Sequence, residues 1–396
     1  MKVLALLLLF CTLTACSFAP DTYLSVTDHA ATPGQTEQAD TLVAEDYSGL
    51  KRAILSFVQA GQSEGTFRVS NYGGDLESDL TDAAYEVAKQ TPLGAYAVDY
   101  MTHDSTLIVN YYEVNIHITF RRTAREIASL ETITTEGGLR MRLQKAVDNH
   151  QSCVALWMPS YQDFEPENMV AEYCAANPGT VMETPDVSVS VYPDSGTVRI
   201  LEVEFTYSES AASLESKEKA VQESIDAAAE YIRYRQTDRD KAELLFTYLM
   251  ERFTYTAGQT TTPVYDALCG GVADPAGLAH AWQLICDRAG VECYTVTGLR
   301  NGEEYLWNIV SDDGDYRQLD LARCVLEVGV LVLRADPEMD QYYWNQELYP
   351  ACEPLPEEPA EPENPPLTEE PPTEGEPPAE EGPSAEDVPP AEELVP

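Results

Sequence analysis

Basic residues are scarce in this sequence. Its 396 residues include 24 Lys and Arg against 68 Asp and Glu, which gives a formal net charge of −44. Proteins that bind nucleic acid neutralise phosphates with Lys and Arg, and electrostatic adhesion to anionic lipid uses the same groups. The composition therefore argues against nucleic acid as a partner. It also argues against a membrane attachment that depends on charge alone.

Histidine is scarce as well, which limits the chemistry open to the chain. The five histidines are His29, His103, His117, His150 and His280. Neither they nor the cysteines show the spacing that is typical of a metal site. The sequence therefore predicts no metal and no cofactor.

The cysteines do not form an even set. Cys11 and Cys16 lie near the N-terminus, which leaves seven, so at least one thiol is unpaired even where disulfides form. Cys324 and Cys352 flank the end of the last predicted domain and could pair. The cysteines that lie in apolar patterns are expected in the core: Cys153, Cys174, Cys286 and Cys293.

The apolar run from Val3 to Leu13 is too short to span a membrane as a mature helix. With the positive start before it, the run is typical of a secretion signal. The following Leu13-Thr14-Ala15-Cys16 resembles the bacterial lipoprotein processing box. By that resemblance, residues 1–15 are a signal peptide and the Cys16 thiol carries diacylglycerol. The expected location is the outer face of the bacterial cytoplasmic membrane; the alternative is an ordinary signal peptide with an incidental cysteine.

Two segments have no pattern that could build a core. Residues 16–45 are polar and read as a tether. Residues 353–396 contain 15 acidic residues, 14 prolines and no Lys or Arg, and are expected to stay extended and disordered. The tail is expected to be a solvated spacer, with a specific docking motif as the alternative.

Between these ends, hydrophobic periodicity predicts two small α/β units of order α-β-α-β-β, over residues 46–132 and 133–213. In the first, a turn is expected at His103-Asp104-Ser105, between strands at 95–101 and 107–121. In the second, the inward face switches from Ile200 to Leu201, which suggests a bulge. The inward helix positions of the two units are Leu50, Ile54, Phe57, Val58, Leu76, Leu80, Ala83, Ala84, Val87, Leu139, Leu143, Ala146, Val147, Met169, Val170, Tyr173 and Cys174.

The third folded part, residues 214–352, is organised around one helix. Asp274-Pro275 is a typical helix start, an N-cap residue followed by proline at the first helical position, and the apolar pattern ends at Ala289-Gly290. Strands follow, with a tight turn at Asp313-Gly314. A further strand is expected from Val325 to Leu333. A closing segment at 339–344 should pack aromatic side chains on the core.

This helix and its strands resemble the bacterial transglutaminase-like family over about residues 240–350. Tyr265-Asp266-Ala267-Leu268 matches a Tyr-x-Ala-Leu run, and Gly277-Leu278-Ala279 and 284–290 match the family helix without a gap. Tyr305-Leu306-Trp307-Asn308 stands where the family has His-Ala-Trp-Asn. The resemblance implies a papain-like α+β fold for this part of the chain.

The same alignment implies that the family's chemistry is absent. It places Pro275 at the nucleophilic cysteine, Tyr305 at the histidine and Asp320 at the acid. Trp307 and Asn308 would remain as a cleft wall, with burial in the core as the alternative for Trp307. Tyr305 and Asp320 are expected to form a hydrogen bond. The expected function is a non-enzymatic surface lipoprotein that binds peptide or cell-wall material.

The rival prediction is an active thiol peptidase or transglutaminase-like enzyme that uses Cys269 of Cys269-Gly270-Gly271. It needs six extra residues before the helix, and no histidine follows the helix to act as base. His280 itself is expected to be a partly exposed helix residue. A third alternative is a purely structural surface subunit.

Replacing Cys16 with Ala should release the protein from the membrane fraction. One acyl chain binds a bilayer only marginally, at about 10⁴ M⁻¹, and a diacylated cysteine supplies a stable anchor. Fractionation of cells that express the full chain measures the effect, with Cys11→Ala as the matched control that should stay membrane-bound. Unchanged membrane retention of Cys16→Ala would rule out this anchor.

Overall fold

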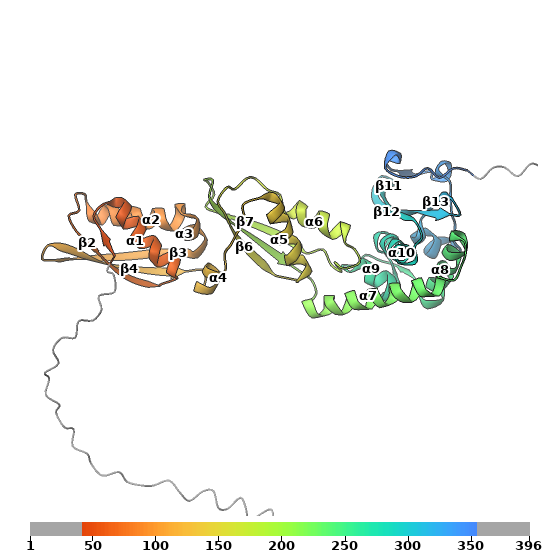
Figure 1. Cartoon of the computed structure of the whole chain (residues 1–396), viewed down its shortest axis with the longest axis horizontal. Coiled ribbons are helices and arrows are strands. Elements are labelled where there is room, and N and C mark those ends of the chain that lie inside the picture. The colour runs from red at the N-terminus through yellow and green to blue at the C-terminus, as the bar shows by residue number, and fades with distance from the viewer. Residues whose placement is uncertain (1–41, 355–396) are drawn as a thin grey trace, which may run out of the picture.

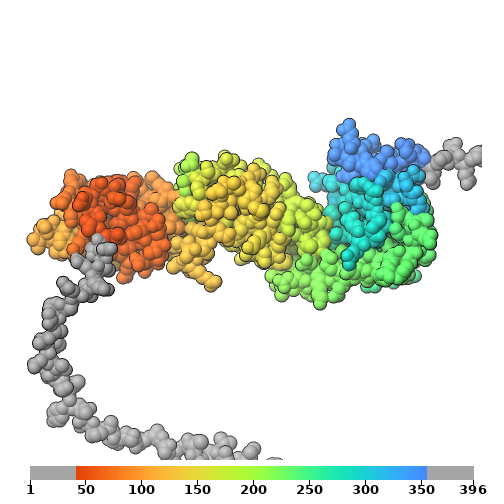
Figure 2. Space-filling view, in the orientation of Figure 1, coloured from red at the N-terminus to blue at the C-terminus, as the bar shows by residue number. Residues whose placement is uncertain are grey.

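The computed structural model describes residues 42–354. The predicted signal peptide, Cys16, most of the tether and the tail from residue 355 lie outside the described residues. The described part is an α+β chain arranged as three bodies in a row (Figure 1). The molecular surface runs from one body to the next (Figure 2). Among the described helices, none combines the length and the apolar character that a membrane crossing requires.

The first unit is a four-stranded sheet of order β1-β2-β4-β3 with helices on one face (Figure 1). The predicted inward residues of its helices are all buried, as are Val114, Ile116 and Ile118 of β4. Its elements are β1 (Val43–Ala44), α1 (Tyr47–Ala60), β2 (Glu64–Val69), α2 (Leu76–Gln90), α3 (Pro92–Ala97), β3 (Val98–Ile108) and β4 (Tyr111–Phe120).

The predicted turn at His103-Asp104-Ser105 is wrong. β3 continues through it, with His103 opposite Ile116 and Asp104 opposite Asn115. β3 is an edge strand, and one face of the sheet carries no helix, so polar side chains fit there. The chain reverses at Val109, whose φ is 55°. The predicted start of the strand at residue 95 is also wrong, because Thr91 caps the short helix α3, with Pro92 at its first turn.

The second unit has the sheet order β5-β6-β8-β7, in which each strand corresponds to one of the first unit. In both units a short leading strand, β1 or β5, pairs in parallel with the next strand, an element that the predicted order lacks. The elements are α4 (Ala124–Ala128), β5 (Glu131–Thr132), α5 (Glu136–Asp148), β6 (Cys153–Met158), α6 (Pro166–Ala176), β7 (Asp186–Tyr192) and β8 (Arg199–Thr206). Because β5 belongs to the second sheet, the second unit begins slightly before residue 133.

The predicted bulge in β8 is wrong, and the reason defines the joint between the two units. The pairing of β8 is continuous on both sides, so Ile200 and Leu201 point to opposite faces. Leu201 lies in the core of the second unit, whereas Ile200 is buried in the core of the first. Beside Ile200, the Arg122 guanidinium donates to Glu202 at 2.5 Å, and this carboxylate is only 3% exposed. The first unit thus covers the part of the second unit's outer sheet face around Ile200 and Glu202.

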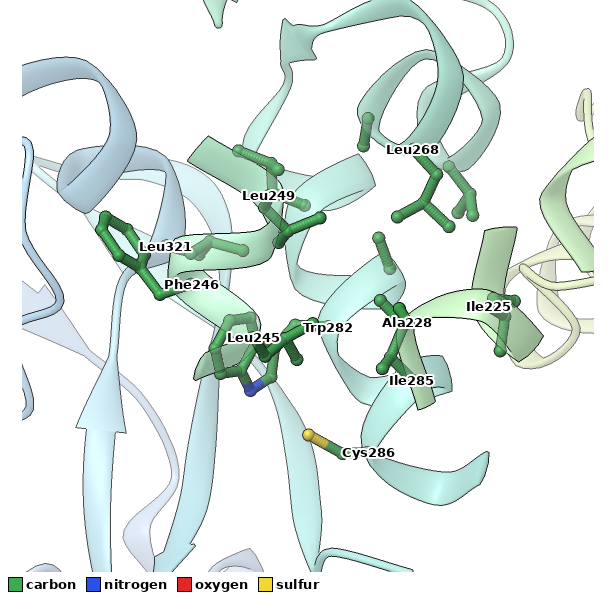
Figure 3. Packing of buried hydrophobic residues seen from close by; sticks show 14 of the residues in the cluster. Ile225, Ala228, Leu245, Phe246, Leu249, Leu268, Trp282, Ile285, Cys286 and Leu321 are labelled. Carbon is green, nitrogen blue, oxygen red and sulfur yellow. The ribbon is translucent and has the colours of Figure 1, made fainter. Parts of the chain in front are cut away.

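The C-terminal domain places helix α10 between α7, α8 and a sheet of order β13-β12-β11-β14. Figure 3 shows Trp282 and Ile285 of α10 among side chains of α7 and α8. The elements are α7 (Ala211–Ile232), α8 (Asp238–Arg252), β9 (Thr256–Ala257), α9 (Pro263–Tyr265), the π-helical turn η1 (Asp266–Gly270), β10 (Val272–Ala273), α10 (Pro275–Ala289), β11 (Cys293–Arg300), β12 (Glu303–Asp312), β13 (Asp315–Leu319), α11 (Leu321–Arg323), the π-helical turn η2 (Cys324–Val328), the short turns η3 (Asp336–Glu338) and η4 (Gln346–Leu348), and β14 (Tyr342–Tyr343).

The predicted bounds of α10 are confirmed. The Asp274 side chain accepts from the Gly277 N–H at 2.9 Å, Pro275 occupies the first turn, and Gly290 ends the helix with a φ of 69°. The Asp313-Gly314 turn is also confirmed, with positive φ at both residues. The strand predicted at Val325–Leu333 is wrong. Asp320 caps α11 immediately after β13, and the chain continues as η2.

The cysteines differ in part from the prediction. All seven in the described residues are free thiols, so Cys324 and Cys352 do not pair. They belong to two separate hydrophobic clusters. Cys174, Cys286 and Cys293 are buried as predicted, whereas Cys153, the first residue of β6, is exposed.

Candidate functional site

A pocket of about 430 Å³ lies at the start of α10. Pro275 and Tyr305, the residues that the resemblance places at the cysteine and histidine positions, both line it. The wall is built by β9, β10, β11, β12, α11 and η2, and its residues are Ala257, Gly258, Gln259, Ala273, Pro275, Arg300, Tyr305, Ala322, Arg323, Leu326 and Glu327. Pro275 and Tyr305, which lie far apart in the sequence, therefore meet in one pocket, as the motifs predicted.

Asp320 lies behind this wall, with a side chain that is 1% exposed. The Tyr305 hydroxyl lies 3.1 Å from each carboxylate oxygen, so the predicted hydrogen bond is present. The Tyr342 hydroxyl donates at 2.5 Å, and the Arg323 backbone N–H donates at 2.9 Å. Arg300 Nη1 lies 3.5 Å away as an ion-pair partner. The buried carboxylate thus has four donor groups around it.

Both phenols act as donors, not as bases. Burial raises the pKa of Tyr305 and the pKa of Tyr342 above the ordinary phenol value, and the nearby Asp320 carboxylate raises them further. A phenol protonated at neutral pH cannot take a proton from a thiol or a water. At this position, Tyr305 can therefore orient Asp320 but cannot replace an imidazole as general base.

Pro275 offers no reactive atom. Its ring fills the first helical position, where the missing N–H costs no hydrogen bond. Among the described residues that line the pocket there is no thiol and no imidazole. The same part of the chain contains no group of His, Cys, Asp and Glu arranged to hold a metal ion. The arrangement can bind a molecule, and it lacks a nucleophile.

Trp307 and Asn308 do not form the predicted cleft wall. Trp307 is 1% exposed, donates its indole N–H to Gln318 at 2.6 Å, and packs against Tyr342 and Trp344. Asn308 is fully buried and donates to the Ala279 carbonyl at 3.0 Å, which joins β12 to α10. Their alternation along β12 sends them to opposite faces of the sheet, so both hold the scaffold behind the pocket.

Cys269, the alternative nucleophile, lies in η1 and outside the pocket lining. Its sulfur lies 3.4 Å from the Ser224 hydroxyl, and within the described residues no imidazole or carboxylate is its hydrogen-bond partner. His280 is half-buried, as predicted, and burial lowers its pKa. It lines a different cavity, of about 490 Å³, between the second unit and the start of α10. The cysteine and the histidine are therefore not brought together.

Sequence reasoning missed four residues of the site: Arg300, Arg323, Glu327 and Tyr342. A signal was present for the arginines, because Lys and Arg are rare in the chain and two of them lie here. Glu327 and Tyr342 had no comparable signal. The sequence predicts a strand where Glu327 lies and a segment of packed aromatic side chains where Tyr342 lies.

Comparisons with known proteins agree with the motifs. A model of the transglutaminase-like superfamily matches residues 225–332. No curated protein sequence matches the chain. One similar solved structure is a TGase, at 12% identity and a TM-score of 0.22, covering 48% of this chain and 58% of that one. Another is a protein from Parabacteroides distasonis proposed to be a protease, at 8% identity and a TM-score of 0.23, covering 65% and 40%. The chain spans less than two thirds of the length of either of these proteins.

Replacing Tyr342 with Phe should destabilise the C-terminal domain, because it removes a donor from the buried Asp320. The expected loss is about 1–3 kcal/mol in the free energy of unfolding. Since Tyr305 and Tyr342 have folded pKa values above the unfolded value, their contribution is complete below about pH 10 and is lost as the pH rises beyond it. As the pH rises into the alkaline range, the free energy of unfolding should therefore decline less steeply in Tyr342→Phe than in the wild type.

Urea denaturation followed by tryptophan fluorescence measures both effects, because Trp282, Trp307 and Trp344 all lie in this domain. Tyr85→Phe is the matched control: Tyr85 is 62% exposed, and its loss should change neither quantity. Equal stability of the two variants, or parallel alkaline declines, would contradict the assigned role of the phenols.

Proposed function

Since residues 225–332 match the transglutaminase-like superfamily, we propose that this domain binds peptide or cell-wall material without turning it over. We further propose that Cys16 anchors the protein by lipid at the outer face of the bacterial cytoplasmic membrane. The observation that supports the proposal is the pocket wall, which contains Pro275 and Tyr305, the two residues that the resemblance places at the family's thiol and imidazole positions.

The loss of both groups supports binding over catalysis. A cysteine at a helix start owes its reactivity to the helix dipole and a cationic histidine, which together stabilise the thiolate. A general base contributes about 10²–10⁴-fold to the rate. Losing either member of such a pair typically costs nearly as much as losing both. Asp320 alone, already saturated with donors, supplies neither role.

The pocket nevertheless keeps the features of a binding site. Its volume of about 430 Å³ lies within the range of ligand sites, about 300–1,000 Å³. One wall is backbone and small side chains at Gly258 and Ala273, where an extended chain can approach closely. The opposite wall carries two arginines, and the apolar Leu326, 41% exposed, lies beside them. This mixture suits a peptide more than a purely apolar molecule.

Filling the pocket should abolish binding. Ala257 is exposed and lines the pocket, so Ala257→Trp places an indole in the space without disturbing the core. Calorimetric titration of the full chain in detergent with soluble cell-wall peptide fragments should show binding to the wild type and a loss of at least about tenfold in the variant. Ala60→Trp, at an exposed position in the first unit, is the control. Absence of heat from the wild type at saturating fragment would refute the binding proposal.

The full chain should neither hydrolyse peptides nor incorporate amines, and Cys269→Ser should leave both assays at background. The reason is geometric, because the Cys269 sulfur has Ser224 as its neighbour and lies outside the pocket. Thiol-dependent turnover that disappears in Cys269→Ser would establish the rival function, an enzyme with a displaced nucleophile. Cys153→Ser, at the exposed thiol of the second unit, controls for non-specific thiol reactivity.

A further inference from the structure

Two arginines hold one carboxylate at the mouth of the pocket. Arg300 Nη2 lies 3.4 Å from one oxygen of Glu327, and Arg323 Nε donates to the other oxygen at 3.0 Å. All three side chains line the pocket. A carboxylate bridged by two guanidinium groups is a common way in which proteins recognise acidic ligands. Here the bridging carboxylate belongs to the protein itself.

We propose that the pocket recognises a ligand carboxylate, which displaces Glu327 from between Arg300 and Arg323. The inference rests on the proposed binding function and specifies its ligand. Glu327 then acts as an internal competitor that holds the two guanidinium groups in position while the pocket is free of ligand. The carboxylate can come from a peptide C-terminus or from an acidic side chain, since both present the same planar group.

Arg300 is prepared for this role by contacts that do not involve Glu327. Its Nη1 donates to the Tyr305 hydroxyl at 3.1 Å and pairs with the buried Asp320 at 3.5 Å. Its guanidinium carbon lies 5.1 Å from the ring centre of Tyr305 and 5.5 Å from that of Tyr342, within cation–π range. These contacts fix the group before a ligand arrives, so little conformational entropy is lost on binding.

Glu327, by contrast, is held weakly. Its side chain is 53% exposed, and its contact with Arg323 is a surface pair four residues apart in the chain. Such pairs contribute little to stability. Within the described residues, Arg323 contacts a carboxylate through its Nε alone, so its terminal nitrogens can turn to a ligand. An incoming carboxylate therefore gains the two cationic contacts of Glu327, and the carboxylate that it displaces is half-exposed and can return to water.

The charges of the lining favour this ligand over a cation. The lining carries two arginines and one glutamate, in a chain whose net charge is −44. The larger cavity of about 490 Å³ beside His280 contains no arginine, lysine or carboxylate in its lining. Of these two cavities, the pocket at Pro275 is thus the one whose wall carries arginines paired with a carboxylate.

The test compares three probes by calorimetric titration of the full chain in detergent. They are acetyl-dialanine with a free C-terminal carboxylate, its carboxamide, and acetyl-glutamate amide. At least one of the two acids should bind about tenfold more tightly than the neutral carboxamide. Which acid binds distinguishes the C-terminal source from the side-chain source.

Two variants test the competition. Glu327→Gln should tighten binding of the preferred acid by up to about fivefold, because the competing charge is gone. Arg323→Ala, at a partly exposed surface position, should weaken it by about tenfold. Glu223→Gln is the matched control, since Glu223 also forms an exposed pair four residues from a basic partner, Lys219, and should change nothing.

The outcomes separate this inference from the proposed function. Equal binding of acid and carboxamide, or weaker acid binding in Glu327→Gln, overturns carboxylate recognition while peptide binding in the pocket still stands. No binding of any of the three probes also overturns it. If cell-wall fragments likewise give no heat, the proposed function fails with it.

Discussion

The buried carboxylate of Asp320 is the constraint on which the C-terminal domain depends. Burying a charge away from water is costly unless hydrogen bonds and opposite charge surround it. The donors around Asp320 come from β11, β12, β14 and α11, so these segments must meet at one point. That meeting orients Tyr305 into the pocket wall and holds Arg300 beside it. The same requirement starts α11 directly after β13 and prevents the chain from continuing as a strand.

Buried carboxylates also hold segments together at the two ends of the second unit, although the chain is strongly acidic. Glu202, 3% exposed, receives Arg122 and the Tyr192 hydroxyl where the first unit covers the second. Glu183 is 6% exposed and accepts the backbone N–H groups of Ser208 and Glu209, where the chain leaves the second unit for α7. Each of these acids has donors in a neighbouring segment, so each fixes the relative placement of two parts. Most of the other acidic residues can stay in water, where their charge favours solubility.

The sequence predicted those features that depend on local interactions. The caps of α10 at Asp274 and Gly290 and the positive φ values at Asp313-Gly314 follow from residue type alone. It failed where another segment decides the outcome. At Ile200 the pattern predicted a bulge, because the local sequence does not show that the first unit covers this residue. At Trp307 it predicted a cleft residue, because β14, which covers the indole, lies far along the chain. The motifs located Pro275 and Tyr305 in one pocket, but the Arg300–Glu327–Arg323 cluster depends on η2, which high β-propensity at 325–333 concealed.

Pro275 and Tyr305 both contribute to the stability of the C-terminal domain. A working thiol and imidazole pair must keep polar groups available for reaction, which usually leaves them incompletely satisfied. Here Pro275 completes a helix start, and the Tyr305 phenol satisfies a buried acid, so both residues stabilise the fold. Arg323 and Glu327 are charged groups of the wall that stay accessible to solvent. These charges are available to a molecule that enters the pocket, whereas Pro275 and the Tyr305 phenol are engaged in contacts within the fold.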